Sequence, residues 1–176
     1  MIITNKVEEA LEIRVDQKPL IIFQKHSEWG PRALGNRSIL FDPRNTDAKN
    51  IVNSFKKREW WRPLAGTILL EYVNDWFDLG SLKESPYMSF AVDAKQKAKD
   101  LTPSIVHVDG TCRVQTVTKE QNFNYYYLIK KFYEKTKVPI LLNTSFNLAG
   151  FPIVETFEQA ILTMENSDFK YMYKPD

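Results

Sequence analysis

Residues 26–44 read HSEWGPRALGNRSILFDPR and combine three arginines with two glycines between two apolar runs, residues 19–23 and 38–41. Gly30 and Gly35 permit backbone angles that other residues avoid, so the loop can turn tightly and approach a ligand. Each arginine offers a planar fork of donors that suits phosphate or carboxylate oxygens. The composition fits binding of a polyanion such as nucleotide phosphates. It also fits a basic surface turn, because one glycine-bearing loop is a weak signal.

The positive charge of the chain is concentrated around this loop. Residues 26–62 hold eight lysines and arginines against four acids, a net charge of +4, whereas the rest of the chain carries −2. Five of the seven arginines lie in this segment, while the lysines are spread along the sequence. Such local enrichment favours an anion-binding surface over a general contribution to solubility.

Length and composition indicate one globular domain that spans residues 1–176. The hydrophobic fraction of 43% and the aromatic fraction of 13% exclude a disordered chain. The apolar runs are too short to span a bilayer, and the N-terminus lacks the pattern of a secretory signal, so we expect a cytoplasmic protein. Cys112 is the only cysteine, which excludes an internal disulfide and a cysteine-rich metal site.

Hydrophobic periodicity predicts helices and strands that alternate along the chain without an internal repeat. This alternation indicates an α/β fold with a sheet of mixed direction. The helix at 123–136 is expected to use Tyr126, Ile129, Lys130 and Tyr133 as one face, and the last helix to direct Ile161, Leu162 and Met164 inward. We expect helices at 7–15, from a cap at Thr46 or Asp47 to about residue 55, at 123–136 and after a cap at Thr156. Residues 95–100 are expected to form a solvated helix face or a loop. Strands are expected at 19–23, 38–41, 66–73, 87–92, 114–117, 139–142 and 169–173.

Four motifs together resemble a known family. They are EWGPRALGNRS (28–38), KKREWWRP (56–63), HVDGTCRVQ (107–115) and LLNTSFNLAGFPIV (141–154). In this order they resemble the C-terminal domain of the O-carbamoyltransferases, the family of the nodulation-factor, cephamycin and tobramycin carbamoyltransferases. The chain departs from the family in carrying Lys25-His26 where a Gly-Arg pair usually precedes the glutamate.

The resemblance implies a YrdC-like fold, a twisted mixed sheet with flanking helices, and a domain that binds ATP. With Mg²⁺, such a domain forms carbamoyladenylate from ATP and carbamoyl phosphate. In the family a separate N-terminal domain, with a metal-binding histidine motif, transfers the carbamoyl group to a hydroxyl. Nothing in this sequence resembles His-x-x-x-His. We therefore expect another domain or polypeptide to supply the transfer.

The resemblance and the residue chemistry together indicate the site. Cationic clamps stabilise a transferring phosphoryl group without a side-chain nucleophile, and short polar side chains at a strand end suit ribose, base or carbamoyl amide. The predicted catalytic residues are Lys56, Arg58 and Arg113, the predicted nucleotide- and carbamoyl-binding residues are Arg32, Arg37, Arg62, Thr111, Asn143, Ser145 and Asn147, and no protein metal site is predicted.

Two other functions fit the same residues. A nucleic-acid-binding module would use the basic segment and its neighbouring tryptophans, and its affinity would fall steeply with salt. A non-catalytic partner protein would expose an apolar patch and bind another chain. The family resemblance favours the nucleotide-binding enzyme over both, and makes nucleic acid the less expected ligand.

Overall fold

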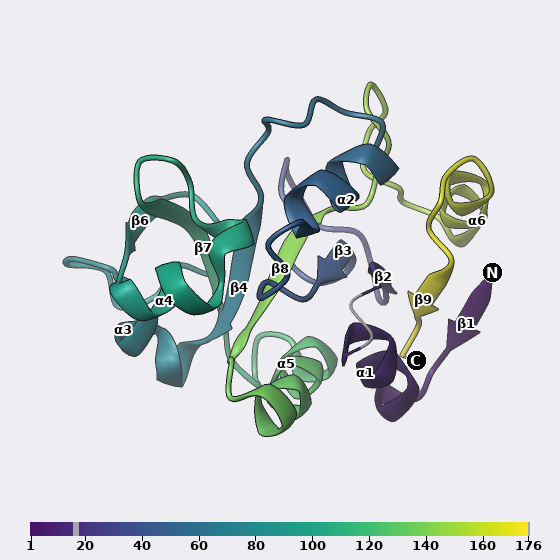
Figure 1. The fold of residues 1–176 in the computed structure, drawn as a ribbon. Coiled ribbons are helices and arrows are strands. Elements are labelled where there is room, and N and C mark those ends of the chain that lie inside the picture. Colours follow the sequence, from purple (N-terminus) through teal and green to yellow (C-terminus); the bar gives the residue numbers. More distant parts are fainter. Residues whose placement is uncertain (16–17, 176) are drawn as a thin grey trace.

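Nine strands form one mixed sheet in the computed structural model of the protein, which describes residues 1–15 and 18–175 (Figure 1). The strands are β1 (Ile2–Thr4), β2 (Leu20–Phe23), β3 (Arg37–Phe41), β4 (Ala65–Leu69), β5 (Phe77–Asp78), β6 (Ala91–Ala94), β7 (Thr111–Val117), β8 (Ile140–Ser145) and β9 (Tyr171–Tyr173). Their order across the sheet is β1-β9-β2-β3-β8-β4-β7-β6-β5. The pairs β1–β9, β9–β2 and β4–β7 are parallel and the others antiparallel.

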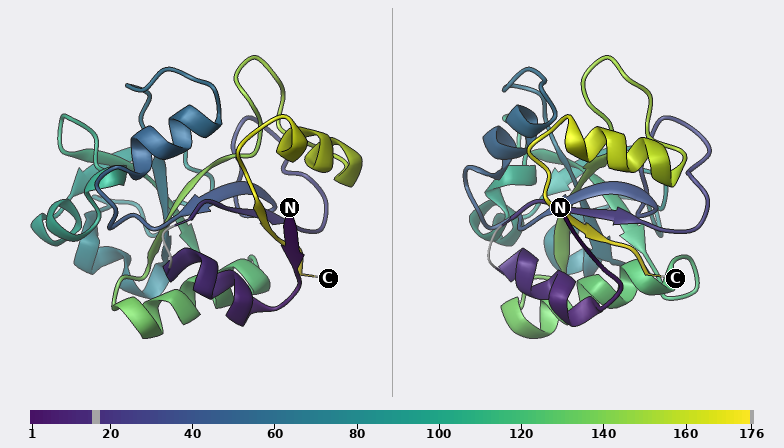
Figure 2. Two further views of the ribbon diagram at one scale, coloured as in Figure 1. Left: turned by 45° about the vertical axis from the view of Figure 1, so that its right-hand side comes forward. Right: turned by 90° about the vertical axis from the view of Figure 1, so that its right-hand side faces the viewer.

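Helices cover both faces of this sheet (Figure 2). They are α1 (Val7–Val15), α2 (Ala48–Phe55), α3 (Val73–Trp76), α4 (Gln96–Leu101), α5 (Phe123–Thr136) and α6 (Phe157–Glu165), with short 3-10 helices η1 (Leu70–Tyr72) and η2 (Pro103–Ile105). Helices α1 and α5 pack together on one face, and α2 and α6 lie over the opposite face. The predicted α/β class, a twisted mixed sheet with flanking helices, is confirmed. Within the described residues, none of the helices combines the length and the apolar character that crossing a bilayer requires.

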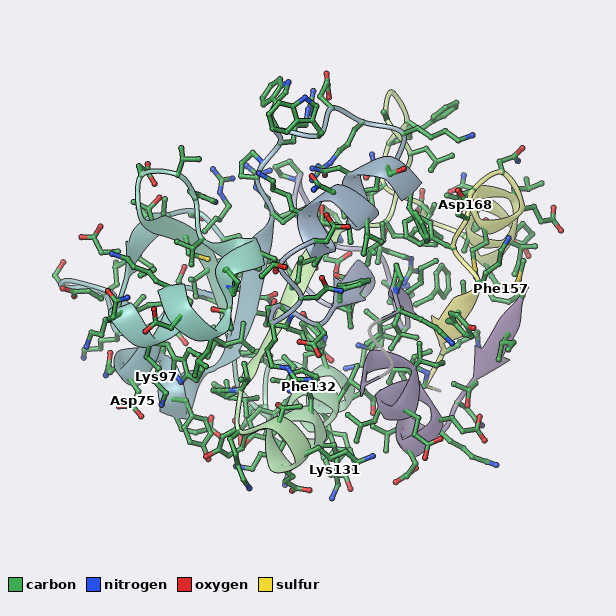
Figure 3. All side chains as sticks on the ribbon, viewed as in Figure 1. Asp75, Lys97, Lys131, Phe132, Phe157 and Asp168 are labelled. Carbon is green, nitrogen blue, oxygen red and sulfur yellow. The ribbon has the colours of Figure 1, made fainter. Side chains whose placement is uncertain are left out.

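The central strands are apolar because both of their faces are covered. Every residue of β2 and β3 is buried, and the core continues through β4, β7 and β8. On α5, Phe132 points toward the sheet and is fully buried, whereas Lys131 lies on the outer side (Figure 3). The cap predicted at Thr156 is present as a capping box with Gln159.

Three predicted strands are shorter by two residues or more than the sequence pattern indicates, and one of them, expected at 169–173, is β9, which begins at Tyr171. The strand expected at 66–73 ends at Leu69, because its partner β8 begins at Ile140, which pairs with Ile68, and the chain then turns into η1. The strand expected at 87–92 is observed as β6, which starts later, at Ala91, and continues to Ala94. Met88 has a φ of 54°, a left-handed conformation that a strand cannot contain.

Two predicted helix faces are only partly confirmed, since Ile129 and Met164 are buried and the other predicted residues are not. Helix α5 buries Tyr125, Leu128, Ile129 and Phe132, so only Ile129 of the expected face is buried. The other three expected residues face η1. The Tyr126 hydroxyl donates to Glu71, Lys130 donates to Tyr72, and the ring of Tyr133 lies 4.6 Å from that of Tyr72. On α6 the buried residues are Ala160 and Met164, whereas Leu162 is 57% exposed.

Candidate anion-binding site

Strand β8 supplies the floor of a cavity at the centre of the sheet. It pairs with β3 on one side and β4 on the other, so Asn143 lies opposite Leu40 and Ala65. Asn143 is fully buried, while Thr144 and Ser145 are partly exposed. Because both edges of the strand are hydrogen-bonded, β8 holds these polar side chains in fixed positions.

A Schellman turn ends helix α2 and directs the cations that follow it. The N–H of Lys57 donates to the carbonyl of Ser54 at 2.9 Å, and the N–H of Arg58 donates to the carbonyl of Asn53 at 3.0 Å. These two bonds define the motif. Lys57 has a φ of 54°, the conformation that glycine usually adopts at this position. As a result Lys57 is exposed, while Lys56 is buried.

The ammonium group of Lys56 is buried against the end of β8. Its Nζ donates to the carbonyl of Ser145, to Ser145 Oγ at 3.2 Å and to Asn147 Oδ1 at 3.0 Å. Burial, and then the nearby charges of Arg58 and Arg62, lower the pKa of Lys56 well below its ordinary value. A bound anion would stabilise this ammonium group.

Buried Asn53 fixes the loop that carries Arg58 and Arg62. Its Nδ2 donates to the carbonyls of Trp60 and Arg62, each at 3.0 Å, and its Oδ1 accepts from Arg58 Nε at 2.5 Å. The sequence reasoning did not assign Asn53 a role. Its effect is to hold both arginines beside the end of β8.

The loop before β3 is folded around the carboxylate of Glu28. One oxygen of this side chain accepts three backbone N–H groups of the same loop, at 2.7 to 3.3 Å. Gly35 has a φ of 106°, and a Cβ added there would lie 2.2 Å from the ring of Tyr125. The loop therefore requires glycine at this position, and it places Arg32 over the end of β8.

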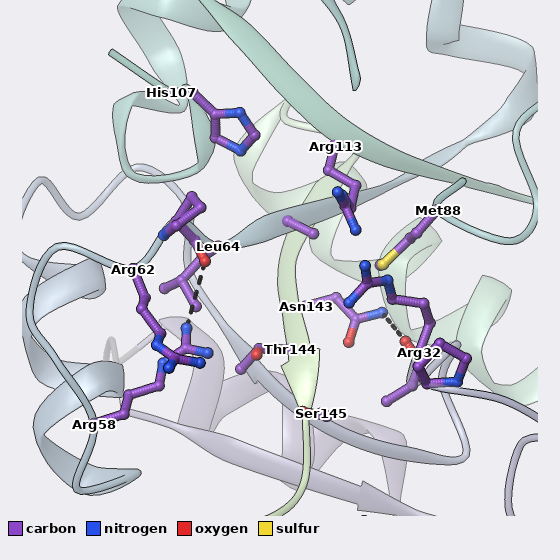
Figure 4. Close-up of a pocket in the computed structure, with 14 residues that line it drawn as sticks. Arg32, Arg58, Arg62, Leu64, Met88, His107, Arg113, Asn143, Thr144 and Ser145 are labelled. Carbon is purple, nitrogen blue, oxygen red and sulfur yellow. Dashed lines mark hydrogen bonds between the residues drawn. The ribbon is translucent and has the colours of Figure 1, made fainter. Parts of the chain in front are cut away.

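Two adjoining cavities open between these elements, and four residues line both. The first has a volume of about 330 Å³ and is shown in Figure 4. The second has a volume of about 370 Å³. Together they are lined by Pro31, Arg32, Ala33, Lys56, Arg58, Glu59, Arg62, Pro63, Leu64, Ala65, Met88, His107, Arg113, Asn143, Thr144, Ser145, Asn147, Ala149 and Gly150.

The charge around the cavities is strongly positive. Five cations line them, and Glu59 is the one carboxylate among the described lining residues. It pairs with Arg62, whose Nε lies 2.7 Å from its Oε2. Burial, and then the charge of Arg113, lower the pKa of Arg32. Burial, followed by the charge of Arg62, lowers the pKa of Arg58 to about 10. The cations repel one another and are only partly neutralised.

Eight of the ten predicted site residues line the two cavities. They come from four separate sequence motifs and four different parts of the fold. The eight residues are Arg32, Lys56, Arg58, Arg62, Arg113, Asn143, Ser145 and Asn147.

Arg37 lies apart from these residues and has a different environment. It is 3% exposed and stacks over the ring of Phe23 at 3.7 Å. All five of its N–H groups donate to backbone carbonyls, at 2.6 to 3.1 Å. The acceptors are the carbonyls of Gln24, Lys25, Asn36 and Glu155. No N–H remains for phosphate, so Arg37 fixes the loop rather than binding the ligand that the sequence predicted for it.

Thr111 does not line either cavity but contacts His107, a lining residue that was not among the predicted site residues. Its Oγ1 donates to Asp109 Oδ1 at 2.8 Å and is 3.1 Å from Nδ1 of His107, which lines the first cavity. Burial lowers the pKa of His107. Thr111 therefore orients His107. The motif at 107–115 contains this histidine, whereas no pattern in the sequence indicates that Met88 lines the cavity.

The site offers little to a metal ion bound by protein alone. Among the described residues, no group of three or more histidines, cysteines, aspartates or glutamates could hold one. Cys112 is fully buried, and burial raises the pKa of its thiol to about 12. Its thiolate is therefore not available for binding or catalysis near neutral pH.

Comparison with known proteins gives the family. The model of the carbamoyltransferase C-terminus matches residues 12–175. Nodulation protein NolNO of Sinorhizobium fredii is 46% identical over 147 residues, which cover 82% of this chain and 22% of that protein. Nodulation protein NolO of Bradyrhizobium diazoefficiens is 44% identical over 147 residues, covering 82% of this chain and 27% of that protein. The chain thus spans about a quarter of the length of these relatives.

Among solved structures, full-length HypF in a phosphate- and nucleotide-bound form has a similar fold. The TM-score is 0.64 at 16% identity, and the match covers 93% of this chain and 20% of HypF. At this identity the likeness establishes the fold alone.

Proposed function

The chain belongs to the carbamoyltransferase C-terminal family, and on that premise we propose that it binds ATP and forms carbamoyladenylate. Carbamoyl phosphate is the proposed source of the carbamoyl group. Water cleaves it to carbamate and phosphate. A carbamate oxygen then attacks the α-phosphorus of ATP, and the bond from that phosphorus to the oxygen bridging it to the β-phosphorus breaks, so that pyrophosphate leaves.

One observation carries this proposal: five cations surround the cavities with a single carboxylate among the described lining residues. Displacement at phosphorus builds charge on oxygens, and fixed cations in a partly dry site stabilise that charge. Arg32, Arg58 and Arg113 supply planar forks for the phosphate chain, and Arg62 lies beside them. Because the lining is poor in carboxylates, Mg²⁺ would arrive bound to the phosphates of ATP rather than to a protein site.

The residues at the end of β8 are proposed to hold the acyl end of the substrate. Lys56 already bonds to Ser145 and Asn147, so one cation and two polar side chains act as a unit. A carbamate or acyl phosphate oxygen entering here would meet an ammonium group whose pKa is lowered by burial. The anion would raise the pKa of Lys56, because an opposite charge close by favours the charged form.

Carbamoyl transfer to a hydroxyl is proposed to need a further domain, because the matched relatives extend well beyond this segment. Trp29 is 101% exposed, Trp60 70% and Trp61 58%, and each lies within three residues of an arginine that lines the cavities. These rings offer apolar area to such a domain. They also favour a second candidate function, RNA binding by base stacking beside a basic groove.

Calorimetry with ATP tests the main proposal. Replacing Arg58 by methionine should weaken binding about tenfold to a hundredfold, since a hydrogen bond to a charged group is worth about 1.5–3 kcal/mol. A matched control is Lys131→Met on α5, which removes one partly exposed positive charge, paired with Glu134, on the opposite face of the sheet from α2. It should leave the affinity unchanged.

Activity is then measured with ATP, Mg²⁺ and labelled carbamoyl phosphate. The expected products are pyrophosphate and a labelled adenylate. If ATP binds but neither product forms, even when the N-terminal part of a relative is added, the enzyme assignment fails. If the chain instead binds RNA with an affinity that falls steeply with salt, and does not bind ATP, the second candidate replaces the first.

A further inference from the structure

The side-chain oxygen of Asn143 is a buried acceptor in the cavity wall, and it accepts no hydrogen bond from the part of the chain that the structure describes. Its Nδ2 donates to the carbonyl of Ala33 at 3.2 Å, to Thr67 Oγ1 at 3.0 Å and to Gln115 Oε1 at 3.1 Å. Its Oδ1 has no hydrogen-bond partner among the described residues, although Asn143 is 0% exposed. Figure 4 shows Asn143 in the wall of the first cavity, with the bond from its amide nitrogen dashed.

The surrounding network fixes which end of the amide is the oxygen. Turning the amide over would bring Oδ1 against the carbonyl of Ala33 and the Oε1 of Gln115, and both of these atoms are acceptors. Gln115 is itself held in place, since its Nε2 donates to the carbonyl of Leu34 at 3.0 Å. A buried acceptor left unpaired costs free energy, so a ligand N–H that reaches Oδ1 would be bound preferentially.

This acceptor lies next to the acyl end of the proposed site. Asn143 and Ser145 are two residues apart on β8, so their side chains point to the same face of the sheet about 7 Å apart. Ser145 is the residue that contacts Lys56. Arg32 and Arg113 line the same cavity as Asn143. A small group attached to a phosphate among these cations would come close to Oδ1.

Because only one acceptor atom of Asn143 is available, the site distinguishes between adenine and a carbamoyl group as the donor of the hydrogen bond. Asparagine recognises adenine with two hydrogen bonds, one from Nδ2 and one to Oδ1. In this site Nδ2 of Asn143 is already committed to three protein acceptors, which leaves only the oxygen. A single acceptor suits the NH2 of a carbamoyl group, which donates N–H and is small enough to enter beside the phosphate.

We propose that Oδ1 of Asn143 accepts an N–H of the carbamoyl group, and that this contact selects carbamoyl over acyl groups of the same size that lack the donor. The proposal rests on the proposed function, because it assigns the specificity of that same site. A site built to bond a substrate N–H rejects the analogue without it, since the buried acceptor then stays unpaired. The acetyl group is such an analogue, with a methyl in place of the amine.

The test measures the dissociation constants of carbamoyl phosphate and acetyl phosphate for the full chain by calorimetry. We expect the wild-type protein to prefer carbamoyl phosphate by about tenfold to a hundredfold. Asn143→Leu removes the acceptor and should bring the two constants within about twofold of each other. Thr67→Val disturbs the same network but keeps Oδ1, so this control should retain the preference even if its thermal stability falls.

Three outcomes overturn the role of Asn143, and the ATP site is tested separately. Equal affinities in the wild-type protein overturn the role of Asn143, and this measurement does not require any variant to fold. A preference that persists in Asn143→Leu, or that is lost equally in Thr67→Val, also overturns it. If neither acyl phosphate binds, the proposal falls, whereas the ATP site is judged by the separate titration of Arg58→Met.

Discussion

Replacing Arg37 by methionine should destabilise the protein strongly, although Arg37 belongs to the same basic segment as the cavity arginines. The guanidinium is 3% exposed, and its five N–H groups donate to backbone carbonyls at 2.6 to 3.1 Å. Removing it leaves several carbonyls without a donor in a buried region. Each buried carbonyl that stays unpaired costs about 1–3 kcal/mol, so the loss of several bonds is a large part of the 5–15 kcal/mol that stabilises a typical domain.

Urea unfolding, followed by circular dichroism and tryptophan fluorescence, measures this loss. Arg58→Met is the matched control, because it removes the same charge from a cavity wall. Its free energy of unfolding should fall by about 1–2 kcal/mol at most, because the bond to buried Asn53 Oδ1 is lost while repulsion from Arg62 is relieved, and its ATP affinity should fall. The reasoning is refuted if Arg37→Met loses less than about 1 kcal/mol of stability and instead abolishes ATP binding. That result would return Arg37 to the ligand site.

Two further predictions concern backbone and charge. Gly35→Ala should cost about 1–3 kcal/mol more in urea unfolding than Gly30→Ala, because both positions have positive φ but only Gly35 would meet the ring of Tyr125; equal losses would contradict this. For Lys56, whose pKa is lowered chiefly by burial and then by Arg58, the folded protein releases its proton before the unfolded chain does. The free energy of unfolding should therefore rise with pH between the lowered pKa and the ordinary value of about 10.4, and a pH series should show a smaller rise for Lys56→Met.

The sequence located the cations well because they lie in local motifs. Lys56 and Arg58 belong to one turn at the end of α2, and Ser145 and Asn147 lie at the end of one strand. Residues that are close together in the sequence also lie close together in the structure, so the residue pattern and the structure agree. Arg113 comes from a distant strand, and only the family resemblance connected it with the others.

What the sequence missed depends on contacts between distant segments. Arg37 and Arg32 lie in the same basic loop segment, and the contacts that distinguish them include the carbonyl of Glu155, which is 118 residues from Arg37 in the sequence. The face of α5 was misplaced by one residue because Tyr126 and Lys130 gain partners on η1, and a pattern of apolar spacing does not contain that information. Met88 reaches the cavity through a left-handed backbone conformation, and a methionine in the sequence does not indicate such a conformation as a glycine would.

The cation cluster reduces the stability of the protein until an anion binds. Lys56, Arg58 and Arg32 all have lowered pKa values, each chiefly because burial disfavours the charged form and then because another cation is close. A fold selected only for stability would replace one of these side chains or add a carboxylate, and the one carboxylate among the described lining residues is committed to Arg62. The unfavourable charge is therefore best explained as preparation for a ligand. An anion that binds the folded state, at a concentration a hundred times its dissociation constant, adds about 2.7 kcal/mol of stability and so opposes the repulsion within the cluster.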